Sequence, residues 1–427
     1  MSVRLFEGPA GTGKTTSLMA ELATIIEERP LCDHEKVLAL TKMHGSRRRL
    51  NCRLAMVKGL YRQFECVTAD SFAWRILRRW RSLSRIRFGA EPAVDDYDEV
   101  CRRAGVLLCE QQVCRWVARA YPVLIVDEMQ DCKGGQIGMV EGLSRFATCL
   151  AAADDYQDLD GDKDNPAVSW AHENAEVTSL TQIHRTTSVG LLAAAFAIRG
   201  GMSVPSNGSG FTLLHALNHN VGASHVSRNL TWWQQCNDIV VITPVRPANS
   251  TFVRKLIIRV EQGPIGKDQF GPYCVPWEES QEEEQTKFLA LLNLPSDPSM
   301  QIDASDISLP DLFGPARSLS AWLDRQRRVA GRTTFTVAEI QEQVRLAHQR
   351  SRAYRRDRAS GIRAMTVHQA KNREFDSVIV LWPYEVQGSP DRQRRLLYNA
   401  ITRAKRQALV VVQNPNRLNA QPFKADG

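Results

Sequence analysis

The sequence lacks a long apolar segment, and its cysteines lack the spacing of a metal site. No run of about 18 apolar residues occurs, which is the length that a membrane-spanning helix needs. The chain begins an apolar strand almost at once, so we expect no signal peptide. The ten cysteines include no C-x-x-C pair, and the closest two are Cys109 and Cys114. These absences favour reduced thiols and a cytoplasmic protein over a disulfide framework or a zinc or iron–sulfur site.

Length and composition are those of a globular protein with more than one domain. The chain has 427 residues, of which 43% are apolar and 24% are charged. This length suffices for two or three domains with cores of their own. The formal net charge of +8 is compatible with a polyanionic partner, although charge alone does not identify one.

The strongest local pattern is LFEGPAGTGKTT, residues 5–16. Gly8, Gly13, Lys14 and Thr15 satisfy G-x-x-x-x-G-K-[ST] between an expected strand and an expected helix. The backbone N–H groups of such a loop surround an anion, and the helix adds its positive N-terminal end. We therefore predict a nucleoside triphosphate site in which Lys14 reaches the phosphates and Thr15 holds Mg²⁺. The alternative is a chance glycine-rich turn. The residues expected to bind the cofactor are Gly8, Pro9, Ala10, Gly11, Thr12, Gly13, Lys14, Thr15 and Thr16.

Short apolar segments alternate with helical segments along the chain. The expected strands are residues 37–41, 66–68, 123–127, 148–153, 177–180, 238–243, 362–366, 377–382 and 408–412. This alternation predicts an α/β fold with doubly wound parallel sheets, whose ligands lie beyond the carboxyl ends of the strands. Gly8, Asp127 and Asp154 all follow such strands, so we expect them to share one site.

Two carboxylates end the strand at 123–127, in the sequence DEMQD. A phosphate-loop ATPase needs one carboxylate near Mg²⁺ and a base that activates water. Asp127 suits the metal and Glu128 suits the base. The alternative is that two acids cap a surface strand.

With DEMQD added to the phosphate loop, the chain resembles the UvrD/Rep-type DNA helicases of helicase superfamily 1. The resemblance runs from residue 5 to about 412, with the family's motifs in their usual order. Besides the phosphate loop and DEMQD, the matching segments are ALTKMHGSRRRL (39–50, motif Ia), TADSFAWRIL (68–77, the T-x-H-S-F segment), AADDYQDLDG (152–161, motif III), LTQIHRT (180–186, motif IV), MTVHQAKNREF (365–375, motif V) and RRLLYNAITRAK (394–405, motif VI).

The resemblance implies ATP and Mg²⁺ as cofactors and assigns further residues to the nucleotide. Gln157 occupies the place of the glutamine that senses the γ-phosphate, and Arg185 and Arg403 occupy the places of two arginine fingers. His184 stands where the family has a tyrosine that stacks on the base, and Glu374 matches a position near the nucleotide. The family's upstream glutamine motif has no room before Leu5, so base preference stays open.

The resemblance also implies contacts with a DNA strand. The matching positions are Thr41, Thr68, Ser71, Thr366 and His368. Hydroxyl and basic contacts of this kind fix a phosphate backbone without recognising sequence. The arginines at 47–49 and at 75–81, beside Trp74 and Trp80, would line a strand-binding groove or else form a solvated basic face. The helix after Thr68 is expected to have Asp70 or Ser71 as its N-cap.

The implied architecture is two RecA-like domains with small insertions. They are residues 1–180, with an insertion at about 78–120, and residues 181–427, with an insertion at about 263–361. The family's motif V glycine is replaced by Asn372, and because Asn tolerates a positive φ, we expect the turn to survive. The motif III segment continues as LDGDKD in place of the family's tryptophan-containing stretch, and Trp170 lies further on.

Two functions remain open. The first is an ATP-dependent helicase or translocase that couples hydrolysis in an interdomain cleft to movement along single-stranded DNA, usually 3′ to 5′ in the family. The second is an ATP-gated, DNA-sensing subunit that works with a partner such as a nuclease, which the short insertions and the altered motif III favour. RNA is a less favoured substrate, since DEMQD is typical of the DNA-acting branch.

Overall fold

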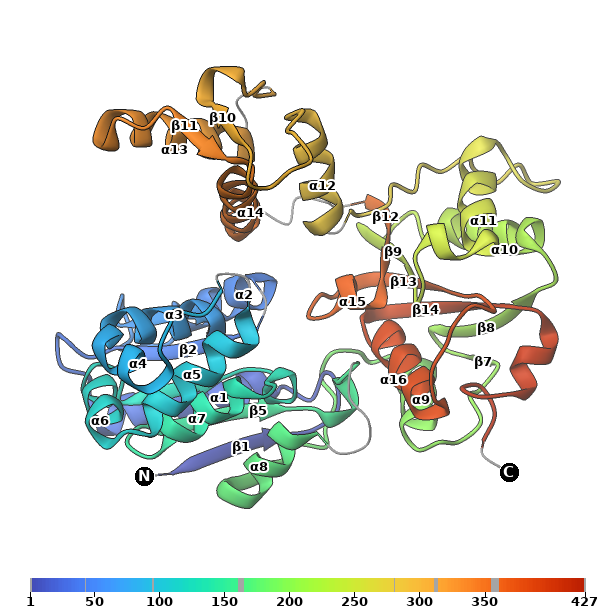
Figure 1. Cartoon of the computed structure of the whole chain (residues 1–427). Helices are drawn as coiled ribbons and strands as arrows, with labels where there is room; N and C mark the ends of the chain where they lie inside the picture. The colour runs from blue at the N-terminus through green and yellow to red at the C-terminus, as the bar shows by residue number, and fades with distance from the viewer. Residues whose placement is uncertain are drawn as a thin grey trace. The chain divides into compact units, whose positions relative to one another are not determined.

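The computed structural model describes residues 2–42, 44–93, 96–159, 165–279, 281–310, 314–354 and 361–425. The chain divides into two compact units (Figure 1). The first contains Met1–Val275 with Gly361–Gly427, and the second contains Pro276–Ser360. Two six-stranded sheets, A and B, lie in the first unit.

Sheet A contains the strands of the first 180 residues, all parallel. Its strands are β1 (Val3–Glu7), β2 (Val37–Thr41), β3 (Phe64–Thr68), β4 (Val123–Val126), β5 (Thr148–Ala153) and β6 (Glu176–Ser179). Their order across the sheet is β3-β2-β4-β5-β1-β6. Because β4, β5 and β1 are neighbours, Asp127, Asp154 and Gly8 follow adjacent strand ends.

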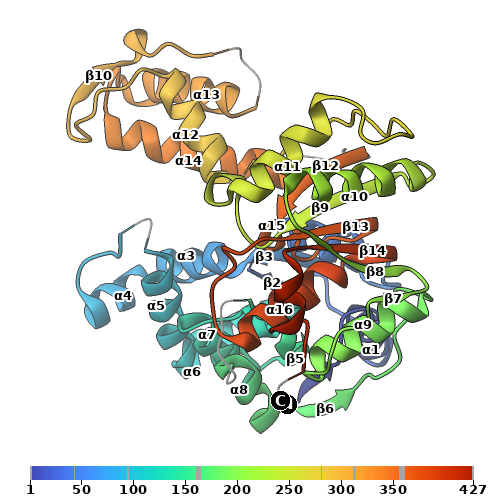
Figure 2. The same cartoon turned by 90° about the vertical axis from the view of Figure 1, so that its right-hand side faces the viewer.

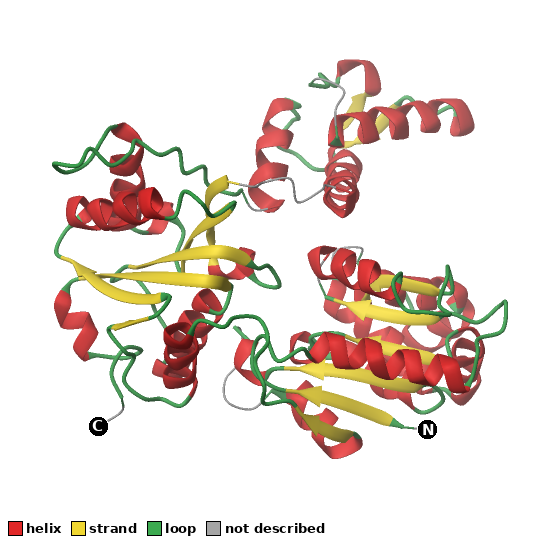
Figure 3. Ribbon diagram, turned by 180° about the vertical axis from the view of Figure 1, so that it is seen from behind, coloured by secondary structure: helices red, strands yellow, loops and turns green. Residues whose placement is uncertain are grey.

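Helices cover both faces of sheet A, as Figure 3 shows. Successive strand residues point to opposite faces, so Phe6 packs with α1 (Lys14–Glu28) and α2 (His44–Leu54), whereas Leu5 packs on the other side. The helices on that other side are α3 (Ala69–Arg79), α5 (Tyr97–Cys109), α6 (Gln111–Ala120), α7 (Gly135–Ser144) and α8 (Pro166–Asn174). The short helix α4 (Arg81–Phe88) follows α3.

Sheet B is parallel except at one edge. Its strands are β7 (Asn207–Gly208), β8 (Phe211–Ala216), β9 (Asp238–Thr243), β12 (Gly361–Thr366), β13 (Phe375–Trp382) and β14 (Ala404–Gln413). The order is β12-β9-β13-β14-β8-β7, with β7 antiparallel to β8. Strand β8 was not predicted, because Thr212 and His215 interrupt its apolar run.

Helices of the second half also pack against sheet B. Helices α9 (Val189–Arg199) and α16 (Pro390–Ile401) share a buried core with β13 and β14. Helices α10 (His219–Trp232) and α11 (Thr251–Gln262) pack on each other, and α10 contacts β8 and β14. The α/β class with two RecA-like, doubly wound domains is therefore confirmed.

The second unit has a small core of its own. It contains α12 (Gln281–Leu291), β10 (Gln301–Asp303), α13 (Pro315–Ala330), β11 (Thr334–Thr336) and α14 (Val337–Tyr354), which Figure 2 shows as a helical group. Strands β10 and β11 form an antiparallel pair, and Phe335, Ile340 and Leu319 lie in the core. The unit lies within the insertion expected at about 263–361. The division of the chain at residue 180 into two domains stays a prediction. Within the described ranges of the chain, no helix has the length and apolar character needed to cross a membrane.

Candidate nucleotide site and nucleic-acid contacts

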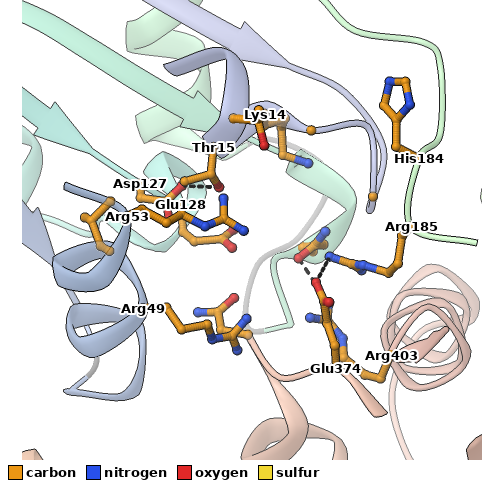
Figure 4. Close-up of a pocket in the computed structure, with 16 residues that line it drawn as sticks. Lys14, Thr15, Arg49, Arg53, Asp127, Glu128, His184, Arg185, Glu374 and Arg403 are labelled. Atoms are coloured by element: carbon orange, nitrogen blue, oxygen red, sulfur yellow. Dashed lines mark hydrogen bonds and ion pairs between the residues drawn. The ribbon is translucent and has the colours of Figure 1, made fainter. Parts of the chain in front are cut away.

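A cavity of about 260 Å³ lies beyond the carboxyl ends of β1 and β4 (Figure 4). Residues from segments that are far apart in the sequence line it. They are Gly11, Gly13, Lys14, Thr15, Thr16, Arg49, Leu50, Arg53, Asp127, Glu128, Gln157, His184, Arg185, Asn372, Glu374 and Arg403. The cavity thus brings together the four residues predicted to be catalytic, both predicted metal ligands and seven of the eleven residues predicted to bind the nucleotide.

The phosphate loop has the backbone that its glycines predict. Gly11 and Gly13 have φ values of 85° and 83°, which side chains rarely adopt. A Cβ atom at Gly8 would lie 2.3 Å from the carbonyl oxygen of Leu180, so only glycine fits there. Lys14 Nζ donates to the carbonyl oxygens of Gly8 (2.7 Å) and Pro9 (3.0 Å). The loop therefore holds the ammonium group at the edge of the cavity.

Four predicted loop residues do not line the cavity but shape the loop. Gly8, Pro9, Ala10 and Thr12 lie behind it, and the Thr12 hydroxyl donates to the Pro9 carbonyl (2.9 Å). The N–H of Ala10 donates to the Tyr398 hydroxyl (2.9 Å), a buried contact between residues 388 positions apart. This hydrogen bond therefore connects the phosphate loop to α16, the helix that packs on sheet B.

Thr15 and Asp127 form the pair expected at a magnesium site. Thr15 Oγ1 donates to Asp127 Oδ1 at 3.3 Å. Burial, with a further contribution from the neighbouring charge of Glu128, raises the pKa of Asp127 to about 6. Two partly buried carboxylates, adjacent in the sequence, therefore line the cavity together with Thr15.

Glu128 has an unusual backbone conformation. Its φ of 67° and ψ of 55° lie in the left-handed region, which non-glycine residues seldom occupy outside functional sites. The Glu128 carboxylate accepts a hydrogen bond from Gln130 Nε2 (2.6 Å), and Gln130 Oε1 accepts one from the backbone N–H of Asp154 (3.1 Å). Gln130, which is fully buried, therefore ties the end of β4 to the end of β5.

Gln157 and Arg403 contact each other across the two halves of the first unit. Arg403 Nη2 donates to Gln157 Oε1 (3.1 Å), and Gln157 Nε2 donates to Asp154 Oδ2 (2.9 Å). Arg403 is 2% exposed, and its Nε and Nη2 also donate to the carbonyl and side-chain oxygens of Asn399. Burial, together with repulsion from Arg185, lowers the pKa of Arg403 to about 10, so the guanidinium remains charged at neutral pH.

Arg185 is held at the opposite side of the cavity. Its Nη2 lies 2.9 Å from Glu374 Oε1, and its Nη1 donates to the Thr402 carbonyl (2.9 Å). Although burial alone would raise it, the pKa of Glu374 is lowered by Arg185, Arg49 and Lys405. Glu374 therefore orients the arginine by an ionised contact.

His184 lies against the phosphate loop. Its backbone N–H donates to the Gly11 carbonyl (2.8 Å), and a Cβ atom at Gly13 would lie 3.7 Å from its Cδ2. The imidazole lines the cavity, as expected for the residue that replaces the family's tyrosine. Asn372 also lines it and has a φ of 62°, which confirms that Asn preserves the turn in place of glycine.

Arg49 and Arg53 are cavity residues that the sequence did not reveal. The arginines at 47–49 were expected either to line a strand-binding groove or to form a solvated basic face, but Arg49 and Arg53 point into the cavity from α2 (Figure 4). The signal was present as an i, i+4 spacing, which puts both side chains on one face of the helix. That spacing alone does not say what the face meets.

Arg199 is a second residue that sequence reasoning missed. Its Nη1 lies 2.7 Å from Asp154 Oδ1 and its Nη2 lies 3.2 Å from Asp155 Oδ1. Asp154 is completely buried, and its Oδ2 lies 3.7 Å from Lys14 Nζ. Attraction by Asp154 outweighs burial and raises the pKa of Arg199. Arg199 ends an otherwise apolar helix, so its pattern gave no functional signal.

The predicted nucleic-acid residues lie at the carboxyl ends of strands or in the first turn of the helix that follows. Thr41 and Thr68 are register partners at the ends of β2 and β3. Thr68 is the N-cap of α3, since its hydroxyl accepts from the N–H of Ser71 (3.3 Å), so the prediction of Asp70 or Ser71 as N-cap was wrong. The backbone of Thr68 is extended, as an N-cap residue requires, whereas Asp70 and Ser71 already lie within the helix.

The corresponding residues on sheet B follow β12. Thr366 is the N-cap of the short helix α15 (Val367–Ala370), in a reciprocal capping box with Gln369. His368 is exposed on that helix. Lys371, the first residue after α15, forms an ion pair with Asp131 of DEMQD. This pair connects the motif V segment to the end of β4.

In the family, a tryptophan-containing stretch follows motif III. Among the described residues that follow Gln157, the first tryptophan is Trp170. Trp170 lies in α8 and packs against the core of sheet A. Residues 160–164 of the LDGDKD stretch lie outside the described residues.

Comparison with known proteins supports the C-terminal part of the resemblance. Residues 361–411 match the family model of the UvrD-like helicase C-terminal domain. This segment includes β12, α15, β13, α16 and most of β14, and thus Thr366, Glu374 and Arg403. A search among curated proteins gave no significant match to the chain. The matched segment is similar to the UvrD-like helicase C-terminal domain, which supports the resemblance of the chain's motifs to the UvrD/Rep-type helicases of superfamily 1.

Proposed function

We propose that the protein is an ATP-dependent DNA helicase or translocase, which moves along single-stranded DNA by hydrolysing ATP in the cavity described above. The observation that carries this proposal is the convergence of Lys14, Thr15, Asp127 and Glu128 with Arg185 and Arg403 around one cavity. A phosphate loop with two carboxylates alone would support nucleotide binding. Two arginines from the motif IV and motif VI segments add the groups that phosphoryl transfer needs.

The residues present fit ATP and Mg²⁺. The inward-turned loop and Lys14 would hold the phosphates, and Thr15 and Asp127 would hold the metal ion, whose charge offsets that of the phosphates when it is bound. The enclosed pair of Asp127 and Glu128 supports this fit, because burial of adjacent carboxylates is favourable when a cation balances them.

The chain's own residues divide the work of hydrolysis. Glu128 accepts a proton from the attacking water, and its contact with Gln130 fixes the direction of the carboxylate. Gln157 and Arg403 are positioned by their mutual hydrogen bond. Arg185 and Arg403 supply fixed positive charge where negative charge develops.

Two connections support coupling between the cavity and a DNA strand. Helix α2 follows Thr41, a proposed strand contact, and carries Arg49 and Arg53 into the cavity. The Lys371–Asp131 ion pair joins the segment of Thr366 and His368 to the end of DEMQD. A strand held at Thr41 and Thr366 would therefore respond to rearrangement of the cavity. The 3′ to 5′ direction is the family's usual polarity.

The proposal is tested by ATP turnover without nucleic acid and with single-stranded DNA, duplex DNA or single-stranded RNA, with Glu128→Gln as the blank. We expect strong stimulation by single-stranded DNA, followed by unwinding of a duplex with a 3′ single-stranded tail. Low turnover that no nucleic acid changes would contradict a translocase. That result would favour the ATP-gated sensor subunit, and co-purification of a nuclease would then be sought.

A further inference from the structure

A second cavity, of about 310 Å³, lies where α3, α4 and the loop after α4 meet. Three apolar residues line it, of which Leu77 is buried and Trp74 and Pro92 are partly buried, and we call them its floor. The exposed Arg78, Arg81 and Arg85 also line it, and we call them its rim. An apolar floor with a basic rim combines a surface for a flat ring with positions for a phosphate.

The charges at this cavity are exposed and easily rearranged. Among the described residues that line it, Glu91 is the single acid. Arg81 Nε lies 2.7 Å and Arg85 Nη2 lies 3.9 Å from Glu91 Oε1, and all three side chains are more than half exposed. Exposed ion pairs of this kind contribute little free energy, so a phosphate can replace the carboxylate at low cost. Three arginines against one carboxylate leave a positive rim.

Trp74 is suited to hold a base. The guanidinium carbon of Arg78 lies 5.4 Å from the centre of the Trp74 ring, within the range of a cation–π contact. Trp74 is partly exposed, and its inner side packs against the core of sheet A. The ring is therefore fixed in position, and the exposed Arg78 guanidinium lies over it, so a base reaches the ring when Arg78 moves aside to the phosphate.

The cavity continues a face of α3 that begins at a proposed strand contact. Ser71, Trp74 and Arg78 follow the i, i+3, i+7 spacing of one helix face. Ser71 is exposed, and Arg78 lies about 10 Å further along the helix. A strand held near Ser71 thus has a direct path over this face to the cavity.

We propose that this cavity receives one nucleotide of the single strand, with its base on the Trp74 floor and its phosphate on Arg78, Arg81 and Arg85. This inference rests on the proposed function, since it extends the path of the same DNA strand. Stacking on an aromatic ring accepts any base, so the contact is independent of sequence. The apolar floor favours a nucleotide over an acidic peptide, which would need the arginines alone.

The test is fluorescence anisotropy of a labelled oligothymidylate at several salt concentrations. Arg81→Ala/Arg85→Ala is expected to weaken binding and to reduce the salt slope by about 0.7 for each phosphate that the variant no longer neutralises. Trp74→Leu is expected to weaken binding about tenfold while the slope stays unchanged. Thermal unfolding confirms that each variant is folded, and the arginine variant tests the proposal even if Trp74→Leu does not fold.

Arg87→Ala is the matched control. Arg87 lies on the same helix and carries the same charge, but it does not line the cavity and lies 3.6 Å from Glu110. Equal effects of Arg87→Ala and the double variant would overturn the proposal, as would displacement of the oligonucleotide by polyglutamate at equal charge. If the wild-type protein itself bound no single strand, the proposed function would fail before this inference was reached.

Discussion

Two cavities of this molecule are lined by arginine, but they differ in how the chain builds them. The nucleotide cavity gathers segments from residue 11 to residue 403, whereas the Trp74 cavity comes from residues 74–92 alone. The first depends on tertiary packing and contains buried charge. The second is local and keeps its charge in solvent.

Two ion pairs of equal length show what this difference means. Arg199–Asp154 and Arg81–Glu91 both measure 2.7 Å. The side chains are 28% and 0% exposed in the first pair, and 59% and 53% exposed in the second. Breaking a buried pair leaves a charge without compensation, whereas water replaces an exposed partner. The distance between the charged atoms therefore does not determine how much each ion pair contributes to the free energy of unfolding.

The largest effect is expected from Lys14→Ala in the nucleotide cavity. The variant loses the ammonium group held by the Gly8 and Pro9 carbonyls. We expect ATP turnover to fall about a thousandfold or more. Steady-state turnover measures this, with thermal unfolding as a check on folding. Unchanged turnover would disprove the assignment of the cavity.

Arg403→Lys is expected to have the next largest effect on turnover. Lysine keeps the charge but cannot reproduce the fork that joins Arg403 to Gln157 and Asn399. We expect kcat to fall about a hundredfold while KM for ATP changes much less. The exposed Arg406, three residues further on and outside the cavity lining, gives the matched control variant Arg406→Lys. If the Arg403→Lys variant kept the wild-type kcat, positive charge alone would suffice at position 403.

The features that could be predicted from the sequence are those with local causes. The phosphate loop, the buried strands and DEMQD each lie within a short segment, whose residue types dictate the backbone and the chemistry. The positive φ of Asn372 was predictable for the same reason. The helix N-cap was misplaced by a few residues, because Thr68, Asp70 and Ser71 are all good caps, and backbone geometry selected Thr68.

The features that could not be predicted depend on packing across the chain. The Ala10–Tyr398 contact joins residues 388 positions apart, and Arg185 reaches the Thr402 carbonyl. Arg49 and Arg199 resemble ordinary surface arginines until the partners brought by the fold are known. The roles of Gln157 and Arg403 were accessible only through resemblance to a family, not through spacing.

Arg199→Ala tests the buried member of the comparison. Its loss leaves Asp154 buried, with Gln157, the Tyr156 N–H and the more distant Lys14 as its neighbours. We expect the free energy of unfolding to fall by about 3 kcal/mol. Turnover should also fall, by about tenfold, because Asp154 would draw Lys14 away from the phosphate loop.

Urea unfolding and ATP turnover measure both effects, and Asp154→Asn with Arg199→Ala completes a double-mutant cycle. Because the two residues act as one pair, the double variant should be more stable than the sum of the single changes predicts. Additive effects would show that Arg199 does not act through Asp154.

Arg81→Ala tests the exposed member and should have the smallest effect on stability. We expect the free energy of unfolding to change by less than about 0.5 kcal/mol, because water replaces Arg81 beside Glu91. In about 1 M salt the screening length falls to about 3 Å, so this small difference should vanish. Most of the Arg199→Ala difference should persist, because Asp154 is completely buried and salt screens a buried charge much less. Urea unfolding at low and high salt measures both variants. A larger or more salt-resistant loss in Arg81→Ala than in Arg199→Ala would show that burial does not determine the strength of these two pairs.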